Sequence, residues 1–232
     1  MEYQQNVNGY IWNNYLINQY IWDGTCGLHA LKNVNLFIKL LENYYINKQT
    51  YEFNDLIASK NFKLLNNENY SDKMLNILLY LNDGNKQTTA TNLYNINKLI
   101  NDKNDTFILQ EDILEEITKN IQNRKTKKIY GLICYYDNII KHWYGIVIDI
   151  NYDKIGIHLL DSYGYIYPNN KNVIEIMRKL DINTIKWSPK YNYTNMFIFN
   201  ILYKIYQFCL FIISYVIYIY GIMYAIKLIN KL

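Results

Sequence analysis

Helical periodicity dominates the first half of the chain. Apolar residues recur at three- and four-residue spacing after residue 26, which predicts a helix from there to about residue 42. The same spacing predicts helices over residues 71–81 and 110–121, with asparagine-rich breaks before and between them. Aromatic and polar residues alternate over residues 10–21, where a short strand or helix is expected. The first half is therefore predicted to be mostly helical.

Strand patterning follows in the third quarter. Runs of β-branched and aromatic residues cover residues 129–136, 142–150 and 155–160, and a short polar turn joins the last two. The pattern over residues 172–180 predicts an amphipathic helix. The pattern over residues 185–188 predicts a last strand. The predicted fold class is α+β, with a helical part packed on an antiparallel sheet.

Composition limits the possible functions. Half of the residues are hydrophobic, which is enough for a sizeable core. Asn, Ile, Tyr and Lys dominate, and Arg124 and Arg178 are the only arginines, a bias typical of AT-rich coding in some large DNA viruses and protists. The abundant tyrosines and asparagines are therefore not interpreted as functional. The net charge of +4, with so few arginines, gives no support for a nucleic-acid partner.

The three cysteines favour a reducing compartment. Cys26, Cys134 and Cys209 fit neither a disulfide framework nor a zinc motif. A four-ligand site built from two of them with His29 and His142 would have irregular spacing for structural zinc. No metal and no cofactor are expected.

The C-terminal region differs from the rest. Residues 205–226 carry no charged side chain, and Lys204 and Lys227 flank them. One helix over that range would extend about 33 Å, enough to cross a hydrocarbon core of about 30 Å. The sequence therefore predicts a domain over residues 1–195 and a hydrophobic membrane anchor over residues 196–232. We expect a single-pass transmembrane helix in a viral or host-cell membrane, with the preceding domain on the cytosolic side.

The stretch around Cys26 is the candidate nucleophile. A polar turn, Asp23-Gly24-Thr25, leads this cysteine into the predicted helix. A thiol at a helix N-terminus faces the positive end of the helix dipole, which lowers its pKa and makes the thiolate available. Gly24 and Gly27 flank the sulfur and leave room for a substrate backbone. The alternative is a small buried cysteine at the start of an ordinary core helix.

The candidate base must be one of the three histidines of the chain. His29 lies on the nucleophile's own helix, so it is expected to be structural or to face the substrate. His142 opens one strand and Asp161 follows the next, so a hairpin would place the two side by side. An imidazole held by a carboxylate is the arrangement that thiol catalysis uses. His158, inside the second strand, is expected to be packed or at the surface.

Two motifs resemble known families. The segment from Asp23 to Leu31 resembles the nucleophile signature of the ovarian-tumour (OTU) family of deubiquitinating cysteine proteases. His142-Trp143, followed by a strand and by Asp161-Ser162, resembles the histidine–aspartate half of Josephin-type and SUMO-protease-type enzymes. The order Cys, His, Asp matches papain and Josephin enzymes and excludes a direct SUMO-protease topology, in which the cysteine comes last. The resemblance implies a papain-like cysteine protease fold.

The resemblance also suggests further site residues. Backbone N–H groups from Gly24 through Thr25 to the cysteine are expected to hold the oxyanion. Gln19, seven residues before the cysteine where papain-type enzymes carry their oxyanion glutamine five or six before it, is the alternative. We expect Asp161 to orient the histidine. If the site instead follows the OTU pattern, Asp23 takes this role.

Three functions are compatible with these residues. The first is a membrane-tethered cysteine peptidase or isopeptidase, an OTU-like deubiquitinase or a protease of ubiquitin-like proteins, acting on a peptide or protein substrate. In it Cys26 attacks the carbonyl carbon and His142 transfers the proton. The second is an acyltransferase or amidase on the same fold, and the third is an inactive membrane protein that keeps the fold. The residues expected to line the substrate cleft are Gly27, His29 and Trp143.

Overall fold

The chain forms two compact units, Met1–Pro189 and Lys190–Leu232. All residues of the candidate site belong to the first unit. The computed structural model describes residues 6–12, 16, 24–47, 51–100, 106–108, 111–123, 127–137, 141–152, 154–163, 166, 168–188 and 209–221.

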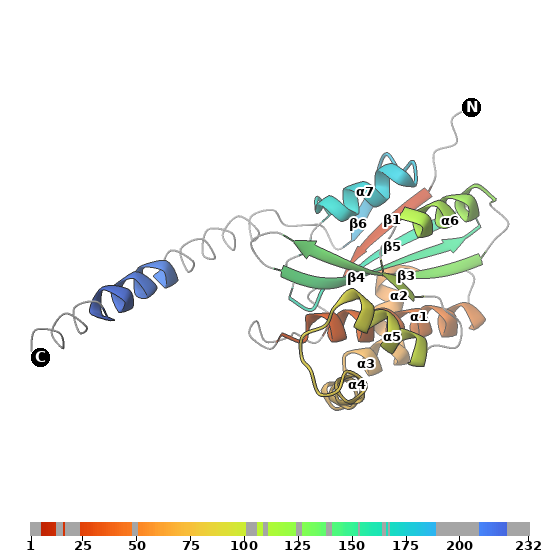
Figure 1. Cartoon of the computed structure of the whole chain (residues 1–232). Helices are drawn as coiled ribbons and strands as arrows, with labels where there is room; N and C mark the ends of the chain where they lie inside the picture. The colour runs from red at the N-terminus through yellow and green to blue at the C-terminus, as the bar shows by residue number, and fades with distance from the viewer. Residues whose placement is uncertain are drawn as a thin grey trace, which may run out of the picture. The chain divides into compact units, whose positions relative to one another are not determined.

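A mixed six-stranded sheet is the frame of the first unit (Figure 1), with strand order β2-β3-β4-β5-β1-β6. The three central strands β3, β4 and β5 are antiparallel, as the hairpin pattern predicts. β1 is parallel to β5, β6 is parallel to β1, and β2 is parallel to β3. The fold class is α+β. The expectation of an antiparallel sheet holds only for the three central strands, because β1, β6 and β2 each pair in parallel with their neighbours. The bounds are β1 Asn6–Ile11, β2 Thr106–Ile108, β3 Lys127–Asp137, β4 Lys141–Asn151, β5 Lys154–Leu160 and β6 Lys186–Ser188.

Helices cover both faces of this sheet (Figure 1). The helices α1 to α5 lie on one face, and α6 and α7 lie on the other. Their bounds are α1 Cys26–Asn47, α2 Phe53–Ala58, α3 Lys60–Leu65, α4 Glu68–Leu81, α5 Ala90–Ile100, α6 Glu111–Gln122 and α7 Lys171–Lys179.

The helix α1 lies between two layers. It contacts β3, β4 and β5 on the sheet side, and it contacts α3, α4 and α5 on the other side. Its contact with β4 is close because Gly145 has no side chain, and a Cβ there would overlap Val34 of α1. On the opposite side Asn35 donates to the Asn97 side chain of α5 over 3.4 Å. The first half of α1 is thereby fixed against β4.

A buried polar chain ties β1, β4 and β5 together. The indole N–H of Trp12 donates to Nδ1 of His158 at 3.1 Å, so the ring proton of His158 lies on Nε2. That nitrogen is 2.8 Å from the Tyr51 hydroxyl, which donates to Oδ2 of Asp149 at 2.7 Å. Burial lowers the pKa of His158 to about 3, so its ring is neutral. This chain holds β5, the strand that ends just before Asp161.

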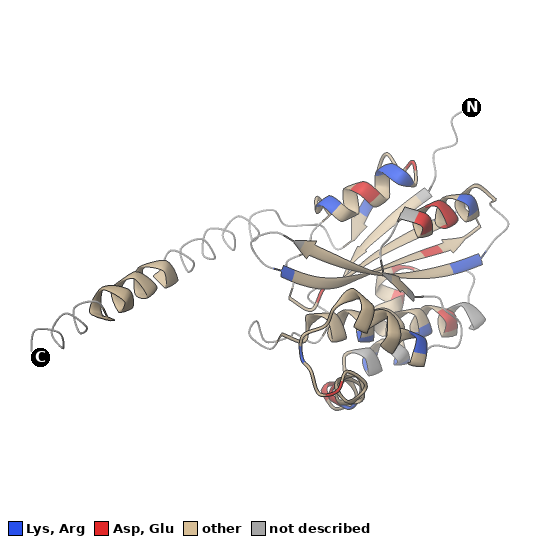
Figure 2. Ribbon diagram, viewed as in Figure 1, with Lys and Arg blue, Asp and Glu red and all other residues tan. Residues whose placement is uncertain are grey.

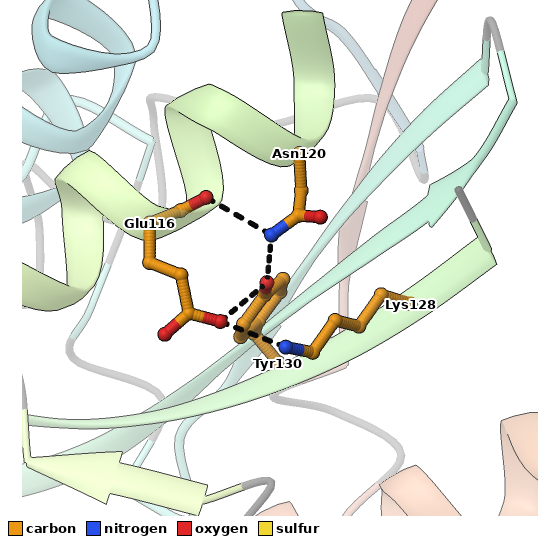
Figure 3. Close-up of polar contacts among 4 residues, drawn as sticks. All are labelled: Glu116, Asn120, Lys128 and Tyr130. Atoms are coloured by element: carbon orange, nitrogen blue, oxygen red, sulfur yellow. Dashed lines mark hydrogen bonds and ion pairs between the residues drawn. The ribbon is translucent and has the colours of Figure 1, made fainter. Parts of the chain in front are cut away.

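A second polar cluster fixes α6 to β3 (Figure 3). Glu116 accepts hydrogen bonds from Lys128 at 2.7 Å and from the Tyr130 hydroxyl at 3.0 Å. Asn120 donates to the same hydroxyl at 2.6 Å. Tyr130 pairs with Ile148, at the end of β4 opposite to His142, so this cluster is structural.

The predicted C-terminal transmembrane helix is wrong, and with it the membrane anchor and the single-pass membrane localisation. In the part of the chain that the structure describes, no helix is long and apolar enough to cross a bilayer. The helix that is described there covers residues 209–221 and carries no charged residue (Figure 2). It extends about 20 Å, against the roughly 30 Å that a span requires. The prediction assumed one helix over residues 205–226, of which 205–208 and 222–226 lie outside the described residues.

The polar chain gives a stability prediction. Tyr51→Phe should lower the free energy of unfolding by about 1–3 kcal/mol, because Asp149 loses a donor and His158 loses an acceptor inside the core. Urea denaturation followed by far-UV circular dichroism measures this loss. The exposed Tyr152, changed to Phe, is the matched control and should leave the midpoint unchanged. Equal midpoints for Tyr51→Phe and the wild type would show that the chain contributes no stability.

Candidate active site

Cys26 is the first residue of α1. Its sulfur is delivered by a turn in which Gly24 has a φ of +72°, a conformation that favours glycine. Thr25 is buried, and its carbonyl accepts a hydrogen bond from the His29 N–H at 3.0 Å, within the first turn. Cys26 therefore lies at the positive end of the helix dipole. The alternative site residues Asp23 and Gln19 lie outside the described residues.

His142 and Asp161 form a buried pair at adjoining strand ends. β4 begins one residue before His142, and β5 ends one residue before Asp161. Nε2 of the imidazole lies 2.6 Å from Oδ1 of the carboxylate, and both side chains are fully buried. The backbone N–H of Tyr163 also donates to Oδ1 at 2.9 Å, and that of Ile166 donates to Oδ2 at 2.8 Å. The two backbone donors fix the carboxylate, which in turn fixes the plane of the ring.

His142 also interacts with Cys26, the candidate nucleophile. Nε2 contacts the aspartate, which leaves Nδ1 as the ring nitrogen available to Cys26, and His142 and Cys26 interact electrostatically. Burial alone would raise the pKa of Cys26. Hydrogen bonds from His142 and from the backbone N–H groups of Trp143 and Gly27, together with the charge on His142, outweigh burial and lower this pKa below its usual value.

The pKa of His142 shifts in the opposite direction to that of Cys26. Burial would lower the pKa of His142, but the hydrogen bonds to Asp161 and Cys26 and their negative charges raise it to about 9. A lowered thiol pKa and a raised imidazole pKa favour a thiolate–imidazolium pair at neutral pH. The arrangement could therefore supply a nucleophile, a proton carrier and an orienter.

Aromatic rings surround the imidazole. The Tyr163 ring stacks on His142 with centroids 4.4 Å apart and an interplanar angle of 27°. The ring of Trp143 packs on the ring of Tyr135, with centroids 4.7 Å apart. The sequence reasoning missed Tyr163, for which the only signal was its place two residues after Asp161. Its partly exposed ring covers one face of the His142 imidazole.

The other predicted cleft residues are packed. A Cβ at Gly27 would overlap Thr88 and lie 3.3 Å from Leu93, so this glycine admits the segment that joins α4 and α5. His29 is buried, and its Nδ1 lies 3.3 Å from the amine of Lys32. The substrate-facing roles of Gly27, His29 and Trp143 stay predictions.

The remaining cysteines and acidic residues do not add to this site. Cys134 is fully buried in β3, where burial raises the pKa of its thiol, and Cys209 is exposed on the helix of the second unit. Among the described residues, no group of three or more histidine, cysteine, aspartate or glutamate side chains could hold a metal ion.

No protein-family model matches the chain, and no curated protein or solved structure is significantly similar to it. The resemblances to papain-like enzymes therefore rest on the residues alone. The fold and the site define an α+β protein in which a cysteine at a helix start, a strand histidine and an aspartate after the neighbouring strand form one constellation.

The lowered pKa of Cys26 predicts the order of cysteine alkylation. At pH 6, iodoacetamide should modify Cys26 before Cys209, although Cys209 is the exposed one. His142→Ala should lower the Cys26 rate at this pH by about tenfold or more, because the thiolate loses its charged donor. Mass spectrometry of the digested protein measures each rate. Earlier labelling of Cys134 or Cys209 would contradict the assignment of the nucleophile.

Proposed function

We propose that the protein is a cysteine peptidase or isopeptidase in which Cys26 is the nucleophile, His142 the proton carrier and Asp161 the orienter. A helix-terminal thiol that interacts electrostatically with a carboxylate-bound imidazole is the observation that carries this proposal. The opposite pKa shifts of Cys26 and His142 support it, because they favour the reactive ion pair at neutral pH.

In the proposed first step, the Cys26 thiolate attacks the carbonyl carbon of the scissile bond. Backbone N–H groups at the start of α1 stabilise the negative charge that develops on the carbonyl oxygen. The imidazolium of His142 gives its proton to the leaving amine, and an acyl-enzyme thioester remains. In the second step, the neutral imidazole takes a proton from water, whose oxygen attacks the thioester and releases the acid and the thiolate. Asp161 holds the ring and offsets its charge throughout.

The substrate class comes from the resemblance and is part of the proposal. The turn before Cys26 resembles that of OTU deubiquitinases, so we propose a ubiquitin-like conjugate or another peptide bond next to a flexible chain end. The conformation of Gly24 and the absence of its side chain are compatible with an extended chain end beside the sulfur.

A panel of electrophilic probes tests this function. The panel should contain ubiquitin-like proteins with a C-terminal electrophile and short peptides with the same group. We expect a covalent adduct on Cys26 with at least one protein or peptide probe, and no adduct with the variants Cys26→Ser and His142→Ala. If iodoacetamide labels Cys26 while no acyl-directed probe does, the thiol is reactive but the peptidase proposal fails.

The orienting role of Asp161 gives a mutational prediction. Asp161→Asn should lower turnover per folded molecule by about 10²–10⁴-fold, because the imidazole loses its charged partner. It should also lower stability, since an amide group cannot replace both acceptor oxygens of the carboxylate. Asp149→Asn is the matched control, a second buried carboxylate bonded to Tyr51, and should lower stability without this loss of turnover. Near-normal turnover in Asp161→Asn would contradict this role and indicate that Asp23 orients His142.

A further inference from the structure

The α4–α5 loop, residues 82–89, lies against the turn that carries Cys26. A Cβ placed on Gly24 would lie 3.7 Å from Cγ of Gln87, which is an ordinary van der Waals distance. A Cβ placed on Gly27 would overlap the hydroxyl oxygen of Thr88. The two glycines flank Cys26 in the chain, so the loop runs beside the backbone that carries the sulfur. The proposed reaction assigns no role to this loop.

Hydrogen bonds hold the α4–α5 loop in one conformation. Asn82 is buried, and its side-chain amide donates to the carbonyl of Asn85 at 2.6 Å and to that of Gln87 at 3.2 Å. Its side-chain oxygen accepts a hydrogen bond from Asn92, in the first turn of α5, at 3.1 Å. The backbone turns at Gly84, whose φ of +74° favours glycine. The backbone of Gln87 is thus fixed from inside the loop, while its side chain is exposed.

The loop and the base approach the nucleophile from different layers. The helix α1 contacts the sheet on one side and α4 and α5 on the other, and all three helices cover the same face of the sheet (Figure 1). His142 and Trp143, which interact with Cys26, belong to β4 on the sheet side. The thiol itself is partly exposed. A substrate carbonyl at the sulfur therefore lies between β4 and the α4–α5 loop.

The side chain of Gln87 matches the chemistry of a peptide chain. Its amide group is one bond beyond Cγ and so lies beside Gly24. A glutamine amide offers an acceptor oxygen and N–H donors, and a peptide group offers one donor and one acceptor. The missing side chain of Gly24 leaves the backbone of the turn open to a second chain. A contact of this kind recognises the main chain of an extended peptide rather than one particular side chain.

We propose that the α4–α5 loop is the substrate-binding element on the helical side of the site, and that the Gln87 amide binds a peptide group beside the scissile bond. This inference rests on the proposed function, because it takes a peptide chain as the substrate of Cys26. The ionisation of the thiol depends on His142 and on backbone N–H groups, so it does not require the Gln87 amide.

The test compares two reagents on the full chain. The first is the peptide or ubiquitin-like vinyl sulfone of the probe panel that labels the wild type fastest, and the second is iodoacetamide, which has no peptide chain. Gln87→Ala should lower the rate of adduct formation with the vinyl sulfone by about three- to tenfold, because one hydrogen bond to the chain is lost. The loss should appear as weaker saturation with an unchanged limiting rate, since the contact is made in the bound state. The iodoacetamide rate should stay within about twofold of the wild type, because the thiolate is unaffected.

A second glutamine supplies the matched control. Gln122 is exposed and ends α6, on the opposite face of the sheet, so Gln122→Ala should leave both rates unchanged. Equal vinyl sulfone rates in Gln87→Ala and the wild type would overturn the proposal. An equal loss with both reagents would also overturn it, because Gln87 would then act on the thiol and not on the substrate.

Failure of the proposed function gives a different result. If no vinyl sulfone of the panel labels Cys26 in the wild type, the peptidase proposal fails and the binding role of Gln87 fails with it. If the wild type is labelled and Gln87→Ala reacts equally fast, the peptidase proposal stands and only the role of the α4–α5 loop is refuted. Because Gln87 is exposed, its replacement should leave the urea midpoint unchanged, so that a lower rate reports binding.

Discussion

The hydrogen bond between Nε2 of His142 and Oδ1 of Asp161 is the interaction on which the site depends. A fully buried imidazole can carry a proton only if a negative group compensates the lost hydration. The carboxylate does so at 2.6 Å, and two backbone N–H groups keep it in place. The ring is held at this nitrogen, and its interaction with Cys26 lowers the thiol pKa in spite of burial.

This geometry depends on two layers that pack against each other through α1. The sheet layer holds β4 and β5 together, and the chain of hydrogen bonds from Trp12 through His158 and Tyr51 to Asp149 supports it. The helical layer holds α1 through the Lys32–Ser71 contact, and Gly145 allows α1 to approach β4. The sulfur and the imidazole meet where the two layers come together.

Local patterns in the sequence predicted the parts of this site that depend on local structure. A helix that starts at Cys26 and a hairpin that brings His142 near Asp161 follow from periodicity and a short turn, and the structure contains both. The parallel insertion of β1 beside β5 could not be read from the sequence, since it pairs residues far apart in the chain. The stacking of Tyr163 on His142 depends in the same way on tertiary packing. The transmembrane prediction rested on the absence of charge over residues 205–226. It was wrong because no helix among the described residues is long and apolar enough to cross a bilayer.

The central claim is that Cys26 and His142 form a thiolate–imidazolium pair. Nitrogen-15 NMR of labelled histidine measures it most directly, because the two ring nitrogens report the protonation state of the imidazole. The account predicts that His142 stays doubly protonated through neutral pH and titrates near pH 9, and that Cys26→Ala lowers this midpoint by removing the thiolate. A His142 ring that is neutral at pH 7 in the wild type, with a midpoint unchanged in Cys26→Ala, would contradict the account.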